Sequence, residues 1–141
     1  MAPKDCVFCQ IAAGSRPAHG VFESRLGLGF LDARPLFRGH CLVTPRRHWE
    51  TLLDLPEEER DALFRDVQLV ARAVKQALGC DGVFVACNNR VSQSVPHLHV
   101  HVVPRRFKDG LRGFFWPRQR YRDEREAGET AAAIRAALAE G

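Results

Sequence analysis

Three of the six histidines lie in one short stretch, where they alternate with apolar residues in the order His97, Leu98, His99, Val100, His101. In a β-strand successive side chains point to opposite faces, so the imidazoles would share one face and the apolar residues would enter the core. A single buried histidine is often structural, but each of three on one face needs partners for its polar ring atoms. The cluster therefore indicates a metal site or a catalytic site.

Two kinds of chemistry fit three histidines on one strand. They could all ligate a metal ion, or one could attack an electrophile while its neighbours support the reaction. An attack on phosphorus also needs hydroxyl and amide donors that hold the phosphate oxygens. Residues of these types precede the histidines on an expected strand–loop–strand return, and they are Asn88, Asn89, Gln93 and Ser94.

Two of the five cysteines, Cys6 and Cys9, form a Cys-x-x-Cys pair. The total of five cysteines is odd, and no secretory signal is visible between Met1 and Gln10. We therefore expect a cytoplasmic protein without a disulfide framework. Structural zinc takes four cysteine or histidine ligands, so the pair alone is a weak signal for a metal. The remaining cysteines lie in apolar runs and are expected to be small buried residues: Cys41, Cys80 and Cys87.

The 141-residue chain is 45% hydrophobic and 27% charged, which is typical of one soluble globular domain. No apolar run approaches the roughly 18 residues that span a bilayer, so no membrane partner is expected. The net charge of +4 is uneven, because residues 105–125 contain eight Lys/Arg and only three Asp/Glu. An anionic ligand near this segment and an ordinary solvated surface both remain open.

The hydrophobic pattern predicts an α+β fold with a mostly antiparallel five-stranded sheet, one long helix and a C-terminal helix. A capping box at Asp54 and Glu57 predicts the start of the long helix, and Gly79 predicts its end. Asp123 and Glu126 predict the start of the last helix. The apolar face of the long helix is expected to comprise Leu63, Val67, Val70, Val74 and Leu78. Strands are expected at residues 21–23, 26–31, 39–44, 82–87 and 97–103.

The segment His97–Val103 matches at every position the His-φ-His-φ-His-φ-φ signature of the histidine-triad family, where φ is an apolar residue. Four shorter segments resemble bacterial members of that family in the same order along the chain, namely Cys6–Cys9, Phe30–Asp32, Gly39–His48 and Gln93–Val95. The resemblance covers about residues 4–105. It implies a single domain of this family across residues 1–141, with a basic, aromatic extension from about residue 105.

The resemblance implies that His99 is a nucleophile. His99 would attack the α-phosphate of a purine nucleoside phosphoramidate or dinucleoside polyphosphate, and water would release a nucleoside monophosphate from the nucleotidyl-histidine intermediate. His101 would donate to a phosphate oxygen, and Ser94 would bond the leaving group or a phosphate oxygen. The implied nucleotide-binding residues are Asp32 for the ribose, Asn88 and Gln93 for the phosphate, and Phe8, Phe30 and Leu31 for the base.

The loop at residues 88–93 departs from the family pattern. Arg90 and Ser92 occupy positions where relatives commonly have glycine, so the backbone approach to phosphate is expected to differ. The choice between Asn88 and Asn89 as a phosphate ligand therefore stays open.

The same resemblance implies a structural zinc ion and a symmetric homodimer. The zinc ligands would be Cys6, Cys9, His48 and His97, and the closed coordination shell would leave His99 free for chemistry. The dimer would pair through the long helix and a sheet edge, which would otherwise be left uncovered.

Two other functions remain open. A metal-dependent enzyme would use all three histidines as ligands. A nucleotide- or nucleic-acid-binding module without turnover would use the aromatic residues interleaved with the basic segment, although the intact histidine cluster makes nucleic acid the less favoured partner. These aromatic residues are Phe107, Phe114, Phe115, Trp116 and Tyr121.

Overall fold

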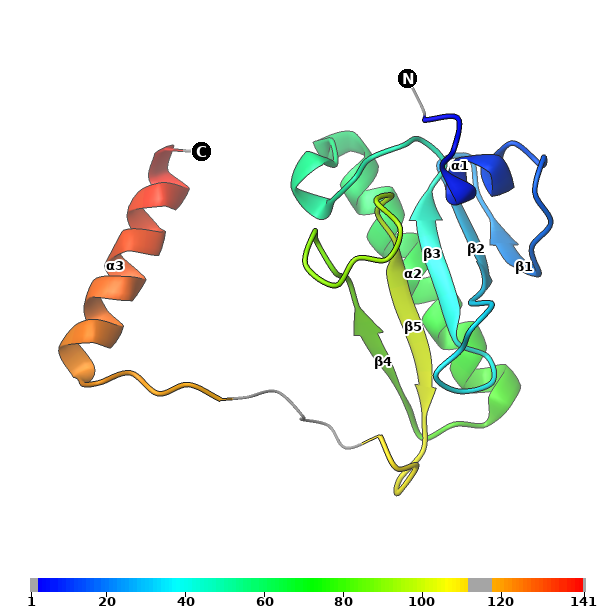
Figure 1. The fold of residues 1–141 in the computed structure, drawn as a ribbon. Helices are drawn as coiled ribbons and strands as arrows, with labels where there is room; N and C mark the ends of the chain where they lie inside the picture. Colours follow the sequence, from blue (N-terminus) through cyan, green and yellow to red (C-terminus); the bar gives the residue numbers. More distant parts are fainter. Residues whose placement is uncertain (1–2, 112–117, 141) are drawn as a thin grey trace. The chain divides into compact units, whose positions relative to one another are not determined.

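Five antiparallel strands form one sheet in the order β1-β2-β3-β5-β4 (Figure 1). The structure is a computed structural model and describes residues 3–111 and 118–140. Every neighbouring pair of strands is antiparallel, which confirms the expected fold class. The strands are β1 (Gly20–Glu23), β2 (Gly27–Leu31), β3 (Cys41–Pro45), β4 (Gly82–Ala86) and β5 (Val100–Arg105).

The long helix α2 (Glu57–Leu78) covers one face of the sheet (Figure 1). Four of its five expected apolar residues are buried, and Leu78 at its end is partly exposed. The helix ends at Gly79, whose φ of 57° lets the chain leave the helix in a left-handed conformation. The buried helix residues pack against alternate positions of β3 and β5, which are Cys41, Val43, Val100 and Val102.

The predicted capping box at the start of α2 is wrong. Asp54 belongs instead to a short 3-10 helix, η1 (Leu52–Asp54), where its carboxylate accepts the backbone N–H and the hydroxyl of Thr51 at 3.0 and 2.7 Å. Because Thr51 caps that helix, Asp54 is already engaged before α2 begins. The N-cap of α2 is Pro56, which makes no side-chain capping bond.

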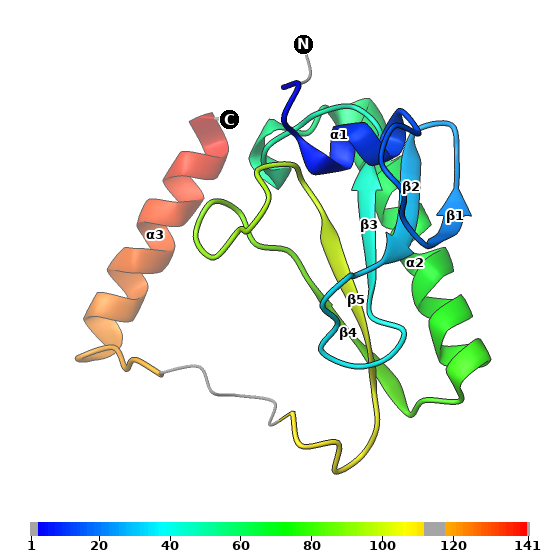
Figure 2. The same ribbon diagram turned by 45° about the vertical axis from the view of Figure 1, so that its right-hand side comes forward.

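The opposite face of the sheet is covered at one end by the short helix α1 (Val7–Ala12; Figure 2). On β3, Leu42 faces α1 while Cys41 and Val43 face α2, as the alternation of a strand predicts. Phe8 of α1 packs there in a second buried cluster, together with Leu28, Phe30 and Leu42.

Strand β5 begins three residues later than predicted and extends two residues further. The N–H of Leu98 does not pair with a strand but donates to the carbonyl of Trp49 at 2.6 Å, in the segment after β3. At the other end, Pro104 pairs with Val83 of β4, whereas the described pairing with β3 stops at Val102. Proline is tolerated where one side of a strand is unpaired.

The chain divides into two units, Met1–Asp109 and Gly110–Gly141. In the second unit, helix α3 (Glu124–Glu140) begins where predicted, because the Glu126 N–H donates to Asp123 Oδ1 at 2.8 Å. The single-domain organisation stays a prediction. No helix in the described ranges is long and apolar enough to cross a membrane. Three aromatic residues of the expected extension lie outside the described residues: Phe114, Phe115 and Trp116.

Gly27 lets the start of β2 approach a buried carboxylate of α2. Asp66 is only 1% exposed, and its Oδ2 accepts a hydrogen bond from the Ser24 hydroxyl at 2.8 Å. The Gly27 N–H in turn donates to Ser24 Oγ at 2.9 Å. A Cβ at residue 27 would overlap Asp66 Oδ2, so only glycine leaves room for this tether between the β1–β2 turn and the helix.

Gly27→Ala should lower the free energy of unfolding by about 2–4 kcal/mol, because it combines overpacking with the loss of a buried hydrogen bond to Asp66. Gly20→Ala is the matched control, since Gly20 also begins a strand and nothing lies within 4 Å of an added Cβ there. Urea unfolding of both variants measures the difference. Equal losses would show that the contact with Asp66 is not the cause.

Candidate active site

One ring nitrogen of His99 is fixed as a hydrogen-bond donor. Its Nδ1 lies 2.7 Å from the carbonyl oxygen of His97, and a carbonyl can only accept. The proton of the neutral imidazole is therefore on Nδ1, and Nε2 keeps its lone pair. The ring is buried edge-on against Phe8 at a centroid distance of 5.1 Å. This geometry suits a nucleophile at Nε2.

His101 is fixed in the opposite tautomer by a chain of two hydrogen bonds. The backbone N–H of Leu36 donates to His40 Nδ1 at 3.1 Å, so the proton of neutral His40 is on Nε2. That Nε2–H donates to His101 Nδ1 at 2.9 Å, which places the proton of neutral His101 on its own Nε2. The rings of His99 and His101 have centroids 5.0 Å apart, so the ring with a lone pair on Nε2 lies beside the ring with an N–H on Nε2.

His40 is a member of the candidate site to which the sequence analysis gave no role. It is buried directly before β3, and Leu42, two positions further on, pairs with His101 in the sheet. Period-two alternation places His40 and Leu42 on the same face, which is the histidine face. This alternation was visible in the sequence, but the pairing of β3 with β5 was not.

Burial keeps His40 and His101 neutral. It lowers the pKa of His101 to about 4, helped by His99 and His40, while Asp32 opposes the shift only in part. Burial also lowers the pKa of His40, again against the carboxylate of Asp32. Asp32 Oδ2 lies 3.6 Å from His40 Nε2, and its Oδ1 accepts the Arg34 N–H at 2.9 Å. At neutral pH His101 is therefore a neutral hydrogen-bond donor, and His40 is neutral as well.

The expected phosphate-binding residues lie on the loop between β4 and β5 and differ in orientation. Asn89 faces inward, since its Oδ1 accepts the first backbone N–H of η1 at 2.7 Å. Asn88 is exposed, and its Nδ2 donates to the Ser92 carbonyl at 3.2 Å. The side-chain amide of Gln93 is hydrogen-bonded to backbone groups through both its oxygen and its nitrogen. Ser94 is exposed. Of the two asparagines, Asn88 is the accessible one.

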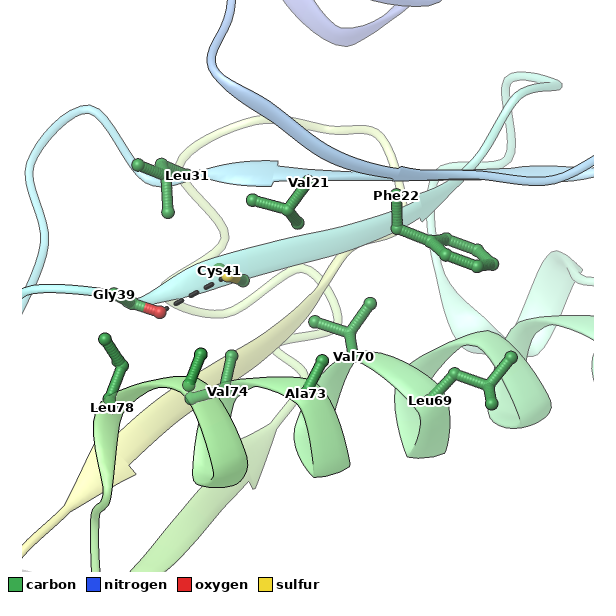
Figure 3. A pocket seen from close by; sticks show the side chains of 11 residues that line it. Val21, Phe22, Leu31, Gly39, Cys41, Leu69, Val70, Ala73, Val74 and Leu78 are labelled. Atoms are coloured by element: carbon green, nitrogen blue, oxygen red, sulfur yellow. Dashed lines mark hydrogen bonds between the residues drawn. The ribbon is translucent and has the colours of Figure 1, made fainter.

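The three residues expected around the base separate between the two faces of the sheet. Phe8 and Phe30 are buried on the face that carries His99, with ring centroids 5.4 Å apart. Leu31 lies on the α2 face, where it lines an apolar cavity of about 240 Å³ together with Leu78 (Figure 3). The sheet thus separates Leu31 from the candidate active site.

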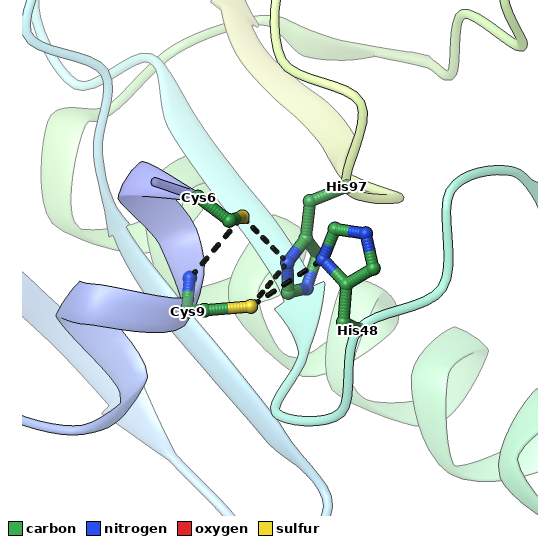
Figure 4. Close-up of side chains that lie close together, drawn as sticks. All are labelled: Cys6, Cys9, His48 and His97. Atoms are coloured by element: carbon green, nitrogen blue, oxygen red, sulfur yellow. Dashed lines mark hydrogen bonds between the residues drawn. The ribbon is translucent and has the colours of Figure 1, made fainter. Parts of the chain in front are cut away.

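Four potential metal ligands converge beside the histidine strand (Figure 4). One ligand atom of each residue lies within 4.8 Å of all the others, and the residues are Cys6, Cys9, His48 and His97. The sulfurs of Cys6 and Cys9 lie 3.4 and 3.5 Å from His97 Nδ1. Cys9 Sγ also lies 3.4 Å from His48 Nδ1. The structure brings the full expected set together from three separate parts of the chain.

The set fits a tetrahedral ion with sulfur and nitrogen ligands. Bond lengths of about 2.3 Å to sulfur and about 2.0–2.1 Å to nitrogen place such ligands roughly 3.6 Å apart, near the observed separations. His97 Nε2 donates to the Pro45 carbonyl at 2.9 Å, so its Nδ1 lone pair faces the cysteines. Burial, followed by the hydrogen bond and charge of Cys6, raises the pKa of Cys9 to about 11. The Cys9 thiol would therefore ionise only beside a cation.

The three alternating histidines do not share one metal site among the described residues. His97 turns toward the cysteines, whereas His101 groups with Asp32 and His40. The 2.9 Å between His40 and His101 nitrogens is a hydrogen-bond distance, so this second group is a hydrogen-bonded chain. The geometry does not support a catalytic metal held by all three.

Fold and site together define a class of small α+β protein. An antiparallel sheet carries a histidine triad, in which two members present opposite ring tautomers and the third joins a Cys/His cluster. Residues 13–108 match the family model of the HIT domain. The chain belongs to the HIT, or histidine triad, family.

Two similar proteins are named for the reactions that they catalyse. The chain is 36% identical over 109 residues to an adenylylsulfatase of Arabidopsis thaliana. The match covers 76% of this chain and 55% of the plant protein, so the chain spans about half of that relative. It is 33% identical over 114 residues to an adenosine 5'-monophosphoramidase of Schizosaccharomyces pombe, covering 79% and 83% of the two chains. A Zn-bound histidine triad family protein from Mycobacterium smegmatis has a similar crystal structure, with a TM-score of 0.73, 39% identity and 96% coverage of both chains.

Nitrogen-15 NMR of the imidazoles tests the assigned tautomers. In the neutral rings, His99 should carry its proton on Nδ1, and His40 and His101 should carry theirs on Nε2. His101 should take up a second proton only near its lowered pKa of about 4. His40→Phe should release His101 into a mixture of tautomers. If His101 titrates near the ordinary histidine value of about 6.5, the assignment of His40 and His101 as buried, neutral, hydrogen-bonded rings is wrong.

Proposed function

We propose that this protein is a nucleotidyl hydrolase or transferase that cleaves at the α-phosphate of a nucleotide conjugate through a nucleotidyl-histidine intermediate on His99. One observation carries the proposal: His99 Nε2 holds a lone pair, and His101 Nε2 holds an N–H. An attack on phosphorus needs both a nucleophile and a donor for the oxygen on which charge develops.

The first step transfers the nucleotidyl group to the protein. The His99 Nε2 lone pair forms a bond to the α-phosphorus, and the leaving group departs with the electrons of the bond that breaks. His101 donates to a phosphate oxygen, and Ser94 hydrogen-bonds the leaving group. In the second step a water oxygen attacks phosphorus, the P–N bond breaks, and a proton is released as the nucleoside monophosphate forms. His99 keeps its Nδ1 proton throughout and regains the lone pair on Nε2.

A purine nucleotide conjugate is the substrate class we infer. Two relatives are named for reactions of adenine nucleotides, an adenylylsulfatase and an adenosine 5'-monophosphoramidase. Asp32, partly exposed, would accept hydrogen bonds from the ribose hydroxyls, and Asn88 would reach the phosphate. The base would lie against the cluster of Phe8 and Phe30. A turnover panel of phosphoramidates, dinucleoside polyphosphates and adenylyl sulfate, read by nucleoside monophosphate release, selects among the conjugates.

A structural zinc ion is the cofactor we propose for the Cys6, Cys9, His48 and His97 cluster. The spacing of the sulfur and nitrogen atoms and the zinc-bound relative support it. With four protein ligands the ion would have no open position, so it would fix the fold and not polarise substrate. The proposed reaction at phosphorus would therefore rely on side chains such as His99 and His101 and not on the metal ion.

The homodimer and the cytoplasmic location remain proposals. Strand β4 is an edge of the sheet, and its Val85 is 43% exposed. An open edge strand with exposed apolar side chains is a surface that proteins usually cover, and a second copy would do so symmetrically.

The binding module without turnover has less support from the basic segment than its composition indicated. Arg105 pairs with Asp109 at 2.6 Å. Arg106 donates to the carbonyls of Leu78 and Gly79, at the end of α2, at 2.6 and 2.8 Å. Arg122 pairs with Glu126 at 2.9 Å. Several of the cations are thus engaged within the chain, which leaves fewer for a phosphate backbone.

His99→Ala should abolish turnover and leave nucleotide binding largely intact. Removing a covalent nucleophile should lower kcat by at least about a thousandfold, whereas the ribose and base contacts remain. His19→Ala is the control, because His19 is exposed outside the cluster. Kinetics and calorimetric binding of the monophosphate measure both effects. A variant that retains a tenth of wild-type activity would rule out His99 as the nucleophile.

Purified protein should contain about one zinc ion per chain. Cys6→Ser combined with Cys9→Ser should lose the metal and melt at a lower temperature, because an ion that binds only the native state stabilises it. Some activity should survive at low temperature. Cys87→Ser, which removes a half-buried thiol elsewhere, should keep the metal. If the double variant stays fully folded yet loses all turnover, the metal takes part in the chemistry.

A further inference from the structure

The loop between β4 and β5 holds two non-glycine residues in the left-handed region of backbone conformation. Arg90 has a φ of 70° and Ser92 a φ of 61°. Side chains disfavour this region, because Cβ comes too close to the following carbonyl oxygen. The turn at Arg90 is also tight, since the Val91 N–H donates to the Asn89 carbonyl at 3.0 Å. Contacts from outside these two residues must therefore hold the loop in this shape.

Gln93 supplies such contacts with both atoms of its side-chain amide. Its Oε1 accepts the Arg90 N–H at 2.8 Å, and its Nε2 donates to the Glu50 carbonyl at 2.6 Å. Glu50 follows Trp49, whose carbonyl accepts the Leu98 N–H at 2.6 Å. The loop and the start of the histidine segment are thus tied to the same two residues of the segment after β3.

We propose that Gln93 is a positioning residue, which holds the strained loop so that the Ser94 hydroxyl faces the leaving group, and is not a ligand of the phosphate. This inference rests on the proposed function. Ser94 follows Gln93 directly in the chain and is exposed, so the direction of its hydroxyl depends on the backbone that Gln93 restrains. A Gln93 amide that turned to a phosphate would give up two short hydrogen bonds and release Arg90 from its unfavourable conformation.

A loop with glycine at both strained positions separates the two roles. Glycine adopts a positive φ at little cost, so a loop that carries Arg90→Gly and Ser92→Gly keeps its shape with less help from Gln93. A positioning role predicts that the loss of Gln93 matters less in this background. A phosphate ligand predicts the same loss in both backgrounds, because its contact with substrate does not depend on loop strain.

Steady-state kinetics of Gln93→Ala in the wild-type and double-glycine chains make the comparison, with adenosine 5'-phosphoramidate or the panel conjugate that is cleaved fastest. In the wild-type chain, kcat should fall at least about tenfold while KM changes less than about threefold. In the double-glycine chain, the fall in kcat should be less than about threefold. An equal fall in both chains, or a tenfold rise in KM, would overturn the positioning role.

Amide hydrogen exchange gives a readout that does not depend on turnover. The Arg90 N–H should exchange at least about tenfold faster in Gln93→Ala, because it loses its acceptor. If wild type cleaves no conjugate of the panel, the proposed function fails. An unchanged exchange rate at Arg90 overturns the inference about Gln93 on its own, whatever the outcome of the kinetics.

Discussion

The main chain at His97 is the point on which the candidate site depends. The His97 carbonyl accepts the His99 Nδ1–H. The His97 ring donates to the Pro45 carbonyl through Nε2 and faces the cysteine sulfurs through Nδ1. Leu98, which follows, is fully buried, with its carbonyl accepting the Thr44 hydroxyl at 2.8 Å. A shift of the backbone here would disturb the ligand cluster and the tautomer of His99 together. His97 therefore couples the fold, the candidate ligand cluster and the proposed nucleophile.

The site holds His40 and His101 as neutral imidazoles where a surface site would use charges. Placing His40, His99 and His101 together would be unfavourable if they were protonated, because like charges repel and burial penalises each one. Hydrogen bonds assign the position of the proton in each neutral ring: His99 through the His97 carbonyl, His40 through the Leu36 N–H, and His101 through His40. In the proposed reaction, positive charge appears on His99 only when phosphorus bonds to Nε2. The hydrogen bond from Nδ1 to the His97 carbonyl then becomes charge-assisted and stronger.

Much of the fold could be predicted from the sequence, because its signals were local. The apolar period fixed α2, and the alternation at residues 97–103 placed the imidazoles on one face. The capping box failed because Asp54 already closes the capping box of η1 with Thr51, before α2 begins. Leu31 was assigned to the base pocket although the same alternation separates it from Phe30. The role of His40 required the pairing of β3 with β5, a contact across 61 residues that no local pattern encodes.

The short helix α1 shows how a structural metal can influence chemistry that it does not touch. A helix of six residues is too short to be stable alone, so its position must come from tertiary contacts. Two such contacts exist: Cys6 and Cys9 at its start face His97, and Phe8 between them packs edge-on against His99. An ion that fixes the two sulfurs would therefore also fix Phe8. Because Phe8 excludes water from one side of the His99 ring, the proposed zinc would act on the nucleophile through packing and not through coordination.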